Sequence, residues 1–343
     1  MEPERFVSVV VPTRNRLSDL QCCVKALAAQ THNAFEIIVV DDASTDSTSQ
    51  WLAEYEQAQT SMPFRWFRND PQLGANPSRN RGIHESRGEL VAFLDDDAFP
   101  EPSWLERLVR PFTCERIAAV TGRVETAPPT NLYEMALKGT QRVSGRIHAT
   151  RLVGCNMCIR RDILDRFRLD EDRAGITPDS CVSGRGDEEG LFLTLRAAGY
   201  EQRVVHDAVV VHHHRYTRGS FFRQGYRGGV SAARLGYKYC LPPRVELVPL
   251  FLAWITLPLV ALDVRLGLVP AACAAFFLAA ILYNELLRKA KTPWETLITL
   301  PLVIAFYHAR MVGYVGEYIR LRTRKHDLPR VRLPRGGPPP NAD

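Results

Sequence analysis

Residues 90–97 read Leu-Val-Ala-Phe-Leu-Asp-Asp-Asp, an apolar run that leads directly into three carboxylates. A run of this length is typical of a buried strand in a parallel sheet. Because adjacent carboxylates repel one another, Asp95, Asp96 and Asp97 need a cation or hydrogen-bond donors close by. A few carboxylate oxygens suit Mg²⁺ or Mn²⁺, which keep water and substrate phosphates as their other ligands. The stretch therefore predicts a strand that ends at a divalent-metal and diphosphate site.

The chain on the N-terminal side of this stretch alternates between strand and helix patterns. Strand patterns cover residues 6–11, 36–40 and 64–68, and helix patterns cover about 17–29 and 47–56. Such alternation predicts an α/β fold with a mostly parallel sheet and helices on both faces. Ligands of these folds bind beyond the carboxyl ends of the strands. We therefore expect the polar residues that follow each strand to form the site.

Polar clusters follow two of these strands. Residues 12–15 read Pro-Thr-Arg-Asn after the first strand, and Asp41 and Asp42 follow the second. Serine and aspartate after a strand are common helix N-caps, and Asp46 suits that role. Capping does not explain two adjacent acids, so we expect both clusters to contact a ligand.

In order and spacing, these segments resemble the motifs of the family 2 glycosyltransferases, which are inverting enzymes with a GT-A fold. The resemblance covers roughly residues 5–235 and includes residues 74–82 (Gly-Ala-Asn-Pro-Ser-Arg-Asn-Arg-Gly) and a DXD motif at 95–97. It implies a Rossmann-like, mostly parallel sheet and a nucleotide-sugar donor. The nucleotide-binding residues that it implies are Pro12, Thr13, Arg14, Asn15, Asp41, Asp42, Asn76, Arg79, Asp95 and Asp96.

The resemblance also implies a metal site and Mg²⁺ or Mn²⁺ as the cofactor. The implied ligands are Asp97, Asp95 and His212. His212 is the first of three consecutive histidines and follows short strand patterns at 204–206 and 209–211. A neutral imidazole is a common metal ligand, so metal binding is expected to weaken as the pH falls.

The catalytic base is expected in the segment Gly-Asp-Glu-Glu-Gly at residues 186–190, at the start of a helix. The resemblance aligns Glu188 with the aspartate that is the usual base of the family, and Asp187 with a glutamate. Either carboxylate can therefore take the role, and acids in a first helical turn also interact favourably with the helix dipole. On the acceptor side, the resemblance implies a polar contact from Asn156.

The eight cysteines show no paired framework, and a chain of this size does not need disulfides to build a core. Cys155 and Cys158 form an isolated Cys-x-x-Cys without a second pair or a histidine at zinc-site spacing. We expect both to be buried as small apolar residues. The first strand pattern begins at residue 6, so no secretory signal is expected, and reduced cysteines favour the cytoplasm.

The last hundred residues differ from the rest in charge and hydropathy. Lys and Arg number 31 against 31 acids in residues 1–240, but 13 against 7 in residues 241–343, so the net charge of +6 lies in the second part. We expect a catalytic domain at 1–240, a membrane region at 245–319 and a basic, disordered tail at 320–343. The expected membrane segments are a hairpin of 247–262 and 266–283 and an interfacial helix at 297–316.

Together these features predict a metal-dependent, inverting glycosyltransferase at the inner membrane, with a cytoplasmic catalytic domain. The expected acceptor is a lipid-linked oligosaccharide, a polysaccharide or a glycolipid, and no nucleic-acid partner is expected, because the basic excess flanks apolar segments. One alternative is transfer to a polyprenyl phosphate, which needs no base because the phosphate is already ionised. The acids at 187 and 188 argue against this alternative, because they suit the role of a base. A sugar nucleotidyltransferase would show a glycine-rich loop after the first strand, and a non-catalytic scaffold would have lost a motif.

Overall fold

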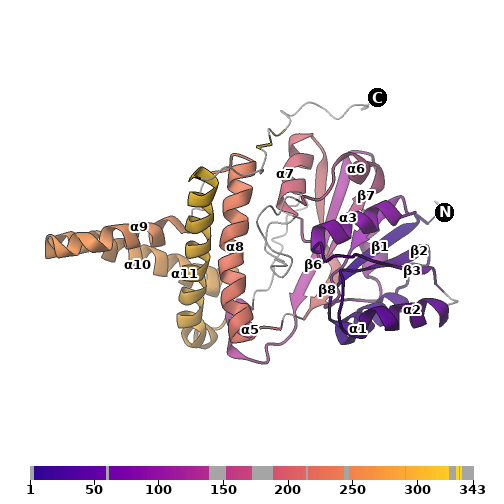
Figure 1. The fold of residues 1–343 in the computed structure, drawn as a ribbon, viewed down its shortest axis with the longest axis horizontal. Helices are drawn as coiled ribbons and strands as arrows, with labels where there is room; N and C mark the ends of the chain where they lie inside the picture. The colour runs from indigo at the N-terminus through magenta and orange to yellow at the C-terminus, as the bar shows by residue number, and fades with distance from the viewer. Residues whose placement is uncertain are drawn as a thin grey trace.

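The central sheet contains eight strands in the order β3-β2-β1-β4-β7-β6-β8-β5 (Figure 1). The structure is a computed structural model, and it describes residues 4–58, 62–138, 152–171, 188–213, 215–242, 247–289, 291–323, 330–331 and 333. Neighbouring strands run parallel from β3 to β4, whereas β7 is antiparallel to both of its neighbours. The fold is α/β with a mixed sheet, and its first half has the predicted parallel arrangement.

The N-terminal half confirms the predicted strands and helices to within two residues at each end. The parallel strands are β1 (Val7–Thr13), β2 (Phe35–Asp41), β3 (Phe64–Arg68) and β4 (Leu90–Phe93). The helices between them are α1 (Leu17–Ala28) and α2 (Thr48–Ala58), as predicted, and α3 (Ala75–Glu85), which was not predicted. These elements are encoded locally, because each apolar run is interrupted by polar residues at its own ends.

The core lies on both faces of the sheet. Because alternate residues of a strand point to opposite faces, Val9 and Val11 of β1 belong to one buried cluster and Val10 belongs to the other. Gly82 of α3 lies so close to β1 that an added Cβ would overlap Val10. This close approach of α3 matters for the site, since α3 carries two of the predicted nucleotide-binding residues.

The C-terminal half of the sheet corrects one prediction. Its strands and helices are β5 (Ala98–Pro100), α4 (Trp104–Val109), β6 (Ile117–Thr126), α5 (Leu132–Leu137), β7 (Met157–Arg160), α6 (Arg161–Arg166), α7 (Glu189–Ala197) and β8 (Glu201–His212). The prediction of two short strands at 204–206 and 209–211 was wrong, because β8 is continuous. Its register against β6 shifts between Gly122 and Arg123, which pair with Val205 and Val209. The polar residues His206 and Asp207 lie in this irregularity and interrupt the apolar pattern.

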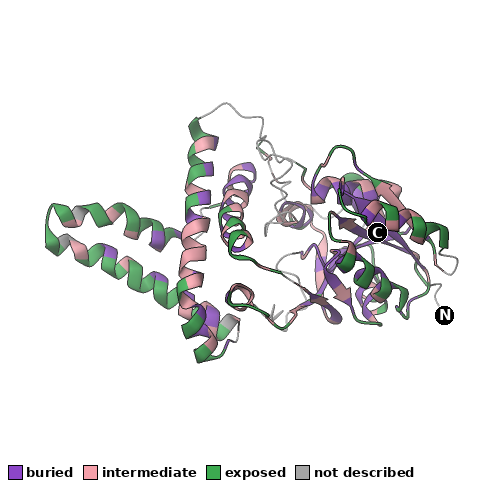
Figure 2. Ribbon diagram, turned by 60° about the horizontal axis from the view of Figure 1, so that its bottom comes forward, coloured by how far each residue is buried: buried purple, intermediate pink, exposed green. Residues whose placement is uncertain are grey.

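The last helices form a projecting hairpin and a helix pair (Figure 1). They are α8 (Arg218–Lys238), α9 (Val248–Thr256), α10 (Leu268–Tyr283), a π-helical turn (Asn284–Arg288) and α11 (Pro293–Thr323). The first expected arm, 247–262, is a short α-helix followed by a 3₁₀ turn over Leu257–Ala261. Pro258 lacks the amide hydrogen that would continue the α-helix, which accounts for the change. Most of the hairpin surface is exposed (Figure 2).

The third apolar run forms a helix of 31 residues, longer than predicted, that packs against α8 (Figure 1). Glycines allow the close approach, because an added Cβ at Gly229 of α8 or Gly313 of α11 would overlap the backbone of the other helix. A buried ion pair joins Arg234 Nε to Glu317 Oε1 at 2.6 Å. Within the described part of the chain, Leu268–Leu287 and Pro293–Thr323 are long and apolar enough to cross a membrane.

Candidate active site

The three carboxylates after β4 point to different partners. Arg79 Nη2 donates to Asp95 Oδ1 at 2.7 Å, and Thr13 Oγ1 donates to Asp96 Oδ2 at 2.8 Å. Arg16 Nη1 lies 3.3 Å from Asp96 Oδ1 and also contacts Asp97. Donors from β1, its following loop and α3 thus offset the repulsion predicted from the sequence.

Asp97 and His212 lie together, as the metal prediction requires. His212 ends β8, and its Nε2 is 2.7 Å from Asp97 Oδ1. Both side chains are buried. Burial alone would lower the pKa of His212, but Cys155 and Asp97 outweigh it and raise that pKa well above its ordinary value. An imidazole and a carboxylate that are 115 positions apart in the sequence therefore share one buried position.

Asp96 has a strongly perturbed carboxyl group. Burial raises the pKa of Asp96 to about 7, because the opposing effect of Arg16 is smaller and the charge of Asp97 adds to the increase. Near neutral pH the turn therefore carries less than three full negative charges.

The two acids after β2 organise the neighbouring turns. Asp42 accepts hydrogen bonds from the backbone amides of Leu73 and Gly74 at 2.8 and 2.7 Å. Asp41 accepts from the Ser44 amide at 2.9 Å and from Arg68 Nη1 at 2.9 Å. Both carboxylates are buried at the carboxyl end of the sheet, where a nucleotide was predicted. They fix the loops that border this position.

The loop after β1 joins the loop after β2. Pro12 and Thr13 end β1, and Arg14 lies half-buried beside them. Asn15 has a φ of 52°, and its Oδ1 accepts a hydrogen bond from the Thr45 amide at 2.7 Å. Asparagine tolerates this left-handed conformation better than most residues. The two predicted nucleotide loops are thus held together by one side chain.

Arg79 links the acidic turn to one candidate base. Asn76 and Arg79 both lie on α3, and Arg79 Nη1 donates to Asn76 Oδ1 at 3.1 Å. The same guanidinium lies 3.7 Å from Glu188 Oε1 and bonds to Asp95 on its other side. The Glu188 carboxylate occupies space that Gly154 leaves open, because a Cβ there would overlap Oε1. The other candidate base, Asp187, lies outside the described residues.

Asn156, the predicted acceptor-side residue, is bonded to three elements of the fold. Its side chain is fully buried, and its Nδ2 donates to the carbonyl oxygens of Arg123 and Ala208 at 2.9 and 3.0 Å. Its Oδ1 accepts from Trp104 Nε1 at 2.8 Å. The amide therefore ties β6, β8 and α4 together.

An open pocket of about 550 Å³ borders Asp97. Its wall includes Arg16, Asp19 and Arg215, and Arg215 Nη2 lies 2.9 Å from Asp19 Oδ1. The sequence assigned no individual role to Arg16 or Asp19, because their pairing with residues about 80 and 200 positions away leaves no local signal. A polar substrate group can reach the metal position from this pocket.

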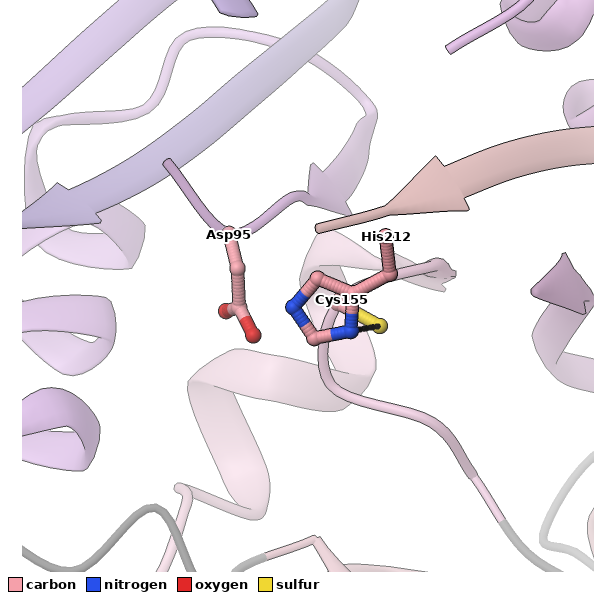
Figure 3. A group of neighbouring side chains, drawn as sticks. All are labelled: Asp95, Cys155 and His212. Atoms are coloured by element: carbon pink, nitrogen blue, oxygen red, sulfur yellow. Dashed lines mark hydrogen bonds between the residues drawn. The ribbon is translucent and has the colours of Figure 1, made fainter. Parts of the chain in front are cut away.

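The side chains at this position suit a divalent metal. Asp95, Cys155 and His212 lie together (Figure 3), and their ligand atoms are within 4.8 Å of one another. Asp97 contacts the same imidazole. Carboxylate oxygen and imidazole nitrogen are ligands that Mn²⁺ and Mg²⁺ accept, with substrate phosphates as further ligands. Asp97, Asp95 and His212 would hold the metal, as the sequence predicts.

Comparison with known proteins places these features in a family. The sequence model described as glycosyl transferase family 2 matches residues 8–168. The chain is 31% identical over 220 residues to glycosyltransferase AglE of Haloferax volcanii, which covers 60% of this chain and 66% of that protein. It is 36% identical over 91 residues to the GalNAc(5)-diNAcBac-PP-undecaprenol beta-1,3-glucosyltransferase of Campylobacter jejuni, covering 26% of this chain and 29% of that one. The chain thus spans no more than two thirds of these relatives.

Solved structures share the fold at low sequence identity. Mannosyltransferase PcManGT of Pyrobaculum calidifontis, solved with GDP-Man and Mn²⁺, has a TM-score of 0.61 and 17% identity, covering 92% of this chain and 88% of that chain. GalNAc-T7, solved with UDP, GalNAc and Mn²⁺, has a TM-score of 0.55 and 16% identity, covering 84% and 59%. This similarity shows the GT-A fold, which the sequence predicted.

Proposed function

Because the chain belongs to the family 2 glycosyltransferases and has a GT-A fold, we propose that it transfers a sugar from a nucleotide-sugar donor to a hydroxyl group of a membrane-associated acceptor. The proposed reaction depends on a divalent metal and inverts the anomeric carbon. The observation that carries the proposal is the meeting of the acidic turn, His212, Arg79 and Glu188 at one edge of the sheet.

The donor is proposed to bind between the loops after β1 and β2 and the acidic turn. Asp97, Asp95 and His212 would hold the metal. A bound Mg²⁺ or Mn²⁺ neutralises the charge that develops on a diphosphate leaving group. Arg16 already contacts Asp96 and Asp97, and its half-exposed side chain lies in the wall of the open pocket. It is therefore placed to contact the diphosphate as well.

Glu188 is proposed as the base that takes the proton of the acceptor hydroxyl. Its carboxylate is held at the N-terminus of α7 by Arg79 and by the space above Gly154. A carboxylate with a fixed position within hydrogen-bond reach of the hydroxyl contributes general-base catalysis. Arg79 contacts both Glu188 and Asp95, so it sets the spacing between the base and the donor-binding acids.

The acceptor is proposed to be lipid-linked, a polysaccharide or a glycolipid at the inner membrane, with the catalytic domain in the cytoplasm. The exposed apolar side chains of the α9–α10 hairpin support a membrane location, because such a surface is unfavourable in water. The name of the Campylobacter relative also includes a polyprenyl diphosphate acceptor. Arg320 and Arg322 at the end of α11 suit an anionic lipid surface.

The test is a donor panel. Full-length protein in detergent or lipid vesicles is incubated with a range of nucleotide sugars, membrane lipid extract and Mn²⁺, and released nucleoside diphosphate and glycosylated lipid are measured. The proposal expects acceptor-dependent release with one donor, loss of release in EDTA, and a product of inverted anomeric configuration. Pyrophosphate release from nucleoside triphosphates, or no turnover with any donor, would contradict it.

A further inference from the structure

A cysteine lies against the histidine of the proposed metal site. Cys155 Sγ is 3.8 Å from His212 Nδ1 (Figure 3), whereas Asp97 contacts Nε2, the other ring nitrogen. Cys155 lies in the turn before β7, and His212 ends β8. Both side chains are 7% exposed, so the sulfur and the imidazole are held in place by packing. The two residues are brought together by the fold, since they are 57 positions apart.

Asp95 completes a set of three ligand atoms. The carboxylate of Asp95, the thiol of Cys155 and the imidazole of His212 lie within 4.8 Å of one another. Arg79 contacts only Oδ1 of Asp95, so the carboxylate has a second oxygen to offer a cation. Small side-chain rotations bring atoms at these separations to within bonding distance of one ion.

The ligand types favour zinc over the harder cations. Sulfur ligands select Zn²⁺, whereas Mg²⁺ binds oxygen. Three protein ligands that combine sulfur, nitrogen and oxygen, with water at a fourth position, are a known arrangement for Zn²⁺. Asp97 contacts the far nitrogen of the imidazole at 2.7 Å, which is the usual way in which a carboxylate orients a zinc-binding histidine.

We propose that Asp95, Cys155 and His212 form a Zn²⁺ site, with His212 binding through Nδ1, the nitrogen that faces the sulfur. Zinc binding displaces the thiol proton of Cys155 to solvent, and no oxidation or reduction takes place. If the chain has the proposed function, Zn²⁺ inhibits transfer. Asp95 and His212 bind both ions, so Zn²⁺ and the Mg²⁺ or Mn²⁺ of the transfer reaction exclude each other.

Binding is tested directly with Co²⁺, which replaces Zn²⁺ and shows a near-ultraviolet charge-transfer band when a thiolate binds it. Full-length, metal-free protein is titrated with Co²⁺ and then with competing Zn²⁺, using wild type, Cys155→Ala, Cys155→Ser and the matched control Cys158→Ala. Cys158 belongs to the same Cys-x-x-Cys but lies in the core of β7. Thermal unfolding of each variant checks that it is folded.

The expected result is a thiolate band in wild type and Cys158→Ala that is lost in both Cys155 variants. In both Cys155 variants the affinity for Zn²⁺ should also fall more than about tenfold, which corresponds to about 1.4 kcal/mol. An unchanged band and affinity in folded Cys155→Ser, or no Zn²⁺ binding by wild type, would overturn the proposal. The spectrum does not depend on turnover, so failure of the proposed transferase activity leaves this test intact. With an active donor, Zn²⁺ should inhibit Mn²⁺-supported transfer less in Cys155→Ala than in Cys158→Ala.

Discussion

The central sheet and the α9–α10 hairpin are both rich in apolar residues, but the sheet buries most of them whereas the hairpin exposes most of its own (Figure 2). Val9 of β1 and Leu52 of α2, which belongs to the same buried cluster, are 0% exposed. Leu262 and Val264 of the hairpin are 80% and 78% exposed. Each Å² of apolar surface removed from water contributes about 25 cal/mol. The side chains of the sheet therefore stabilise the fold themselves, whereas those of the hairpin gain this free energy only when another apolar phase covers them.

This difference in burial indicates that the sheet and the hairpin have different roles. The sheet supports a site in which nearly every acid has a partner, and the hairpin offers a surface suited to lipid. The α8–α11 pair lies between them, packed through glycines and a buried ion pair. Substitutions in each region should therefore change different measured quantities.

The largest effect is expected at the edge of the sheet. Glu188→Gln should lower transfer by roughly 10² to 10⁴ with little change in donor affinity, because the proposed base does not contact the nucleotide. Asp187→Asn should lower the rate of transfer less than Glu188→Gln does, and Glu188→Asp should retain measurable activity. Steady-state kinetics of the three variants decide the assignment. Near-normal turnover in Glu188→Gln together with collapse in Asp187→Asn would transfer the role to Asp187.

The same substitution in the two apolar regions tests their difference directly. Leu52→Ala should lower the free energy of unfolding by about 2 to 5 kcal/mol, because it leaves a cavity in the core. Urea unfolding followed by tryptophan fluorescence measures the change. A loss below about 0.5 kcal/mol, which is typical of surface substitutions, would show that this side chain does not support the core.

Gly154→Ala should reduce turnover without unfolding the protein. The added Cβ overlaps Oε1 of Glu188, which lies at the end of a flexible side chain and can move away. A displacement of about 1 Å can cost as much as 10²-fold in rate. The control is Gly219→Ala, where the added Cβ is 3.8 Å from its nearest neighbour. Unchanged turnover in Gly154→Ala would mean that Glu188 does not act from this position.

Gly229→Ala should weaken the packing of α11 on α8. The added Cβ overlaps the backbone carbonyl of Arg310, so the helices must separate, at a cost of about 1 to 3 kcal/mol. Limited proteolysis and thermal unfolding report the change. Gly236→Ala on the same helix is the matched control, because its nearest neighbour is 3.8 Å away and alanine favours the helix. Equal behaviour of the two variants would contradict the packing shown here.

The smallest effect on stability is expected in the hairpin. Leu262→Ala should change the free energy of unfolding in detergent by less than about 0.5 kcal/mol, because the side chain is largely exposed. Multiple polar substitutions along α9 and α10 should instead reduce binding to lipid vesicles while leaving the sheet folded. Flotation with vesicles measures this, and unchanged flotation would argue against lipid as the covering phase.

The sequence predicted those features whose signal lies within one short segment of the chain. The strands β1 to β4 and the helices α1 and α2 were predicted because each carries its own apolar pattern and polar ends. Helix α3 was not predicted, because few of its residues are apolar. The acidic turn and His212 were paired only through the family resemblance, since residues 97 and 212 belong to distant segments. The prediction of two strands in place of β8 was wrong, because the polar residues His206 and Asp207 in its irregularity resemble a turn between two strands.

Contacts between distant segments were missed. Nothing near Asn156 in sequence indicates that its amide bonds to β6, β8 and α4. Cys155 and Cys158 are buried as expected, but the contact of Cys155 with His212 is made only by the folded sheet. The packing of α11 on α8 likewise depends on glycines of both helices, and the sequence does not show that these glycines face each other.

The central claim is that Asp97 serves a metal-dependent sugar transfer at the edge of the sheet. Its most direct test is acceptor-dependent release of nucleoside diphosphate by wild type and Asp97→Ala, each with Mn²⁺ and with EDTA. The account predicts that EDTA abolishes release by wild type, and that Asp97→Ala loses roughly 10² to 10³-fold with Mn²⁺ present while its thermal unfolding stays near that of wild type. Full release by wild type in EDTA, or near-normal release by Asp97→Ala with Mn²⁺, would contradict it.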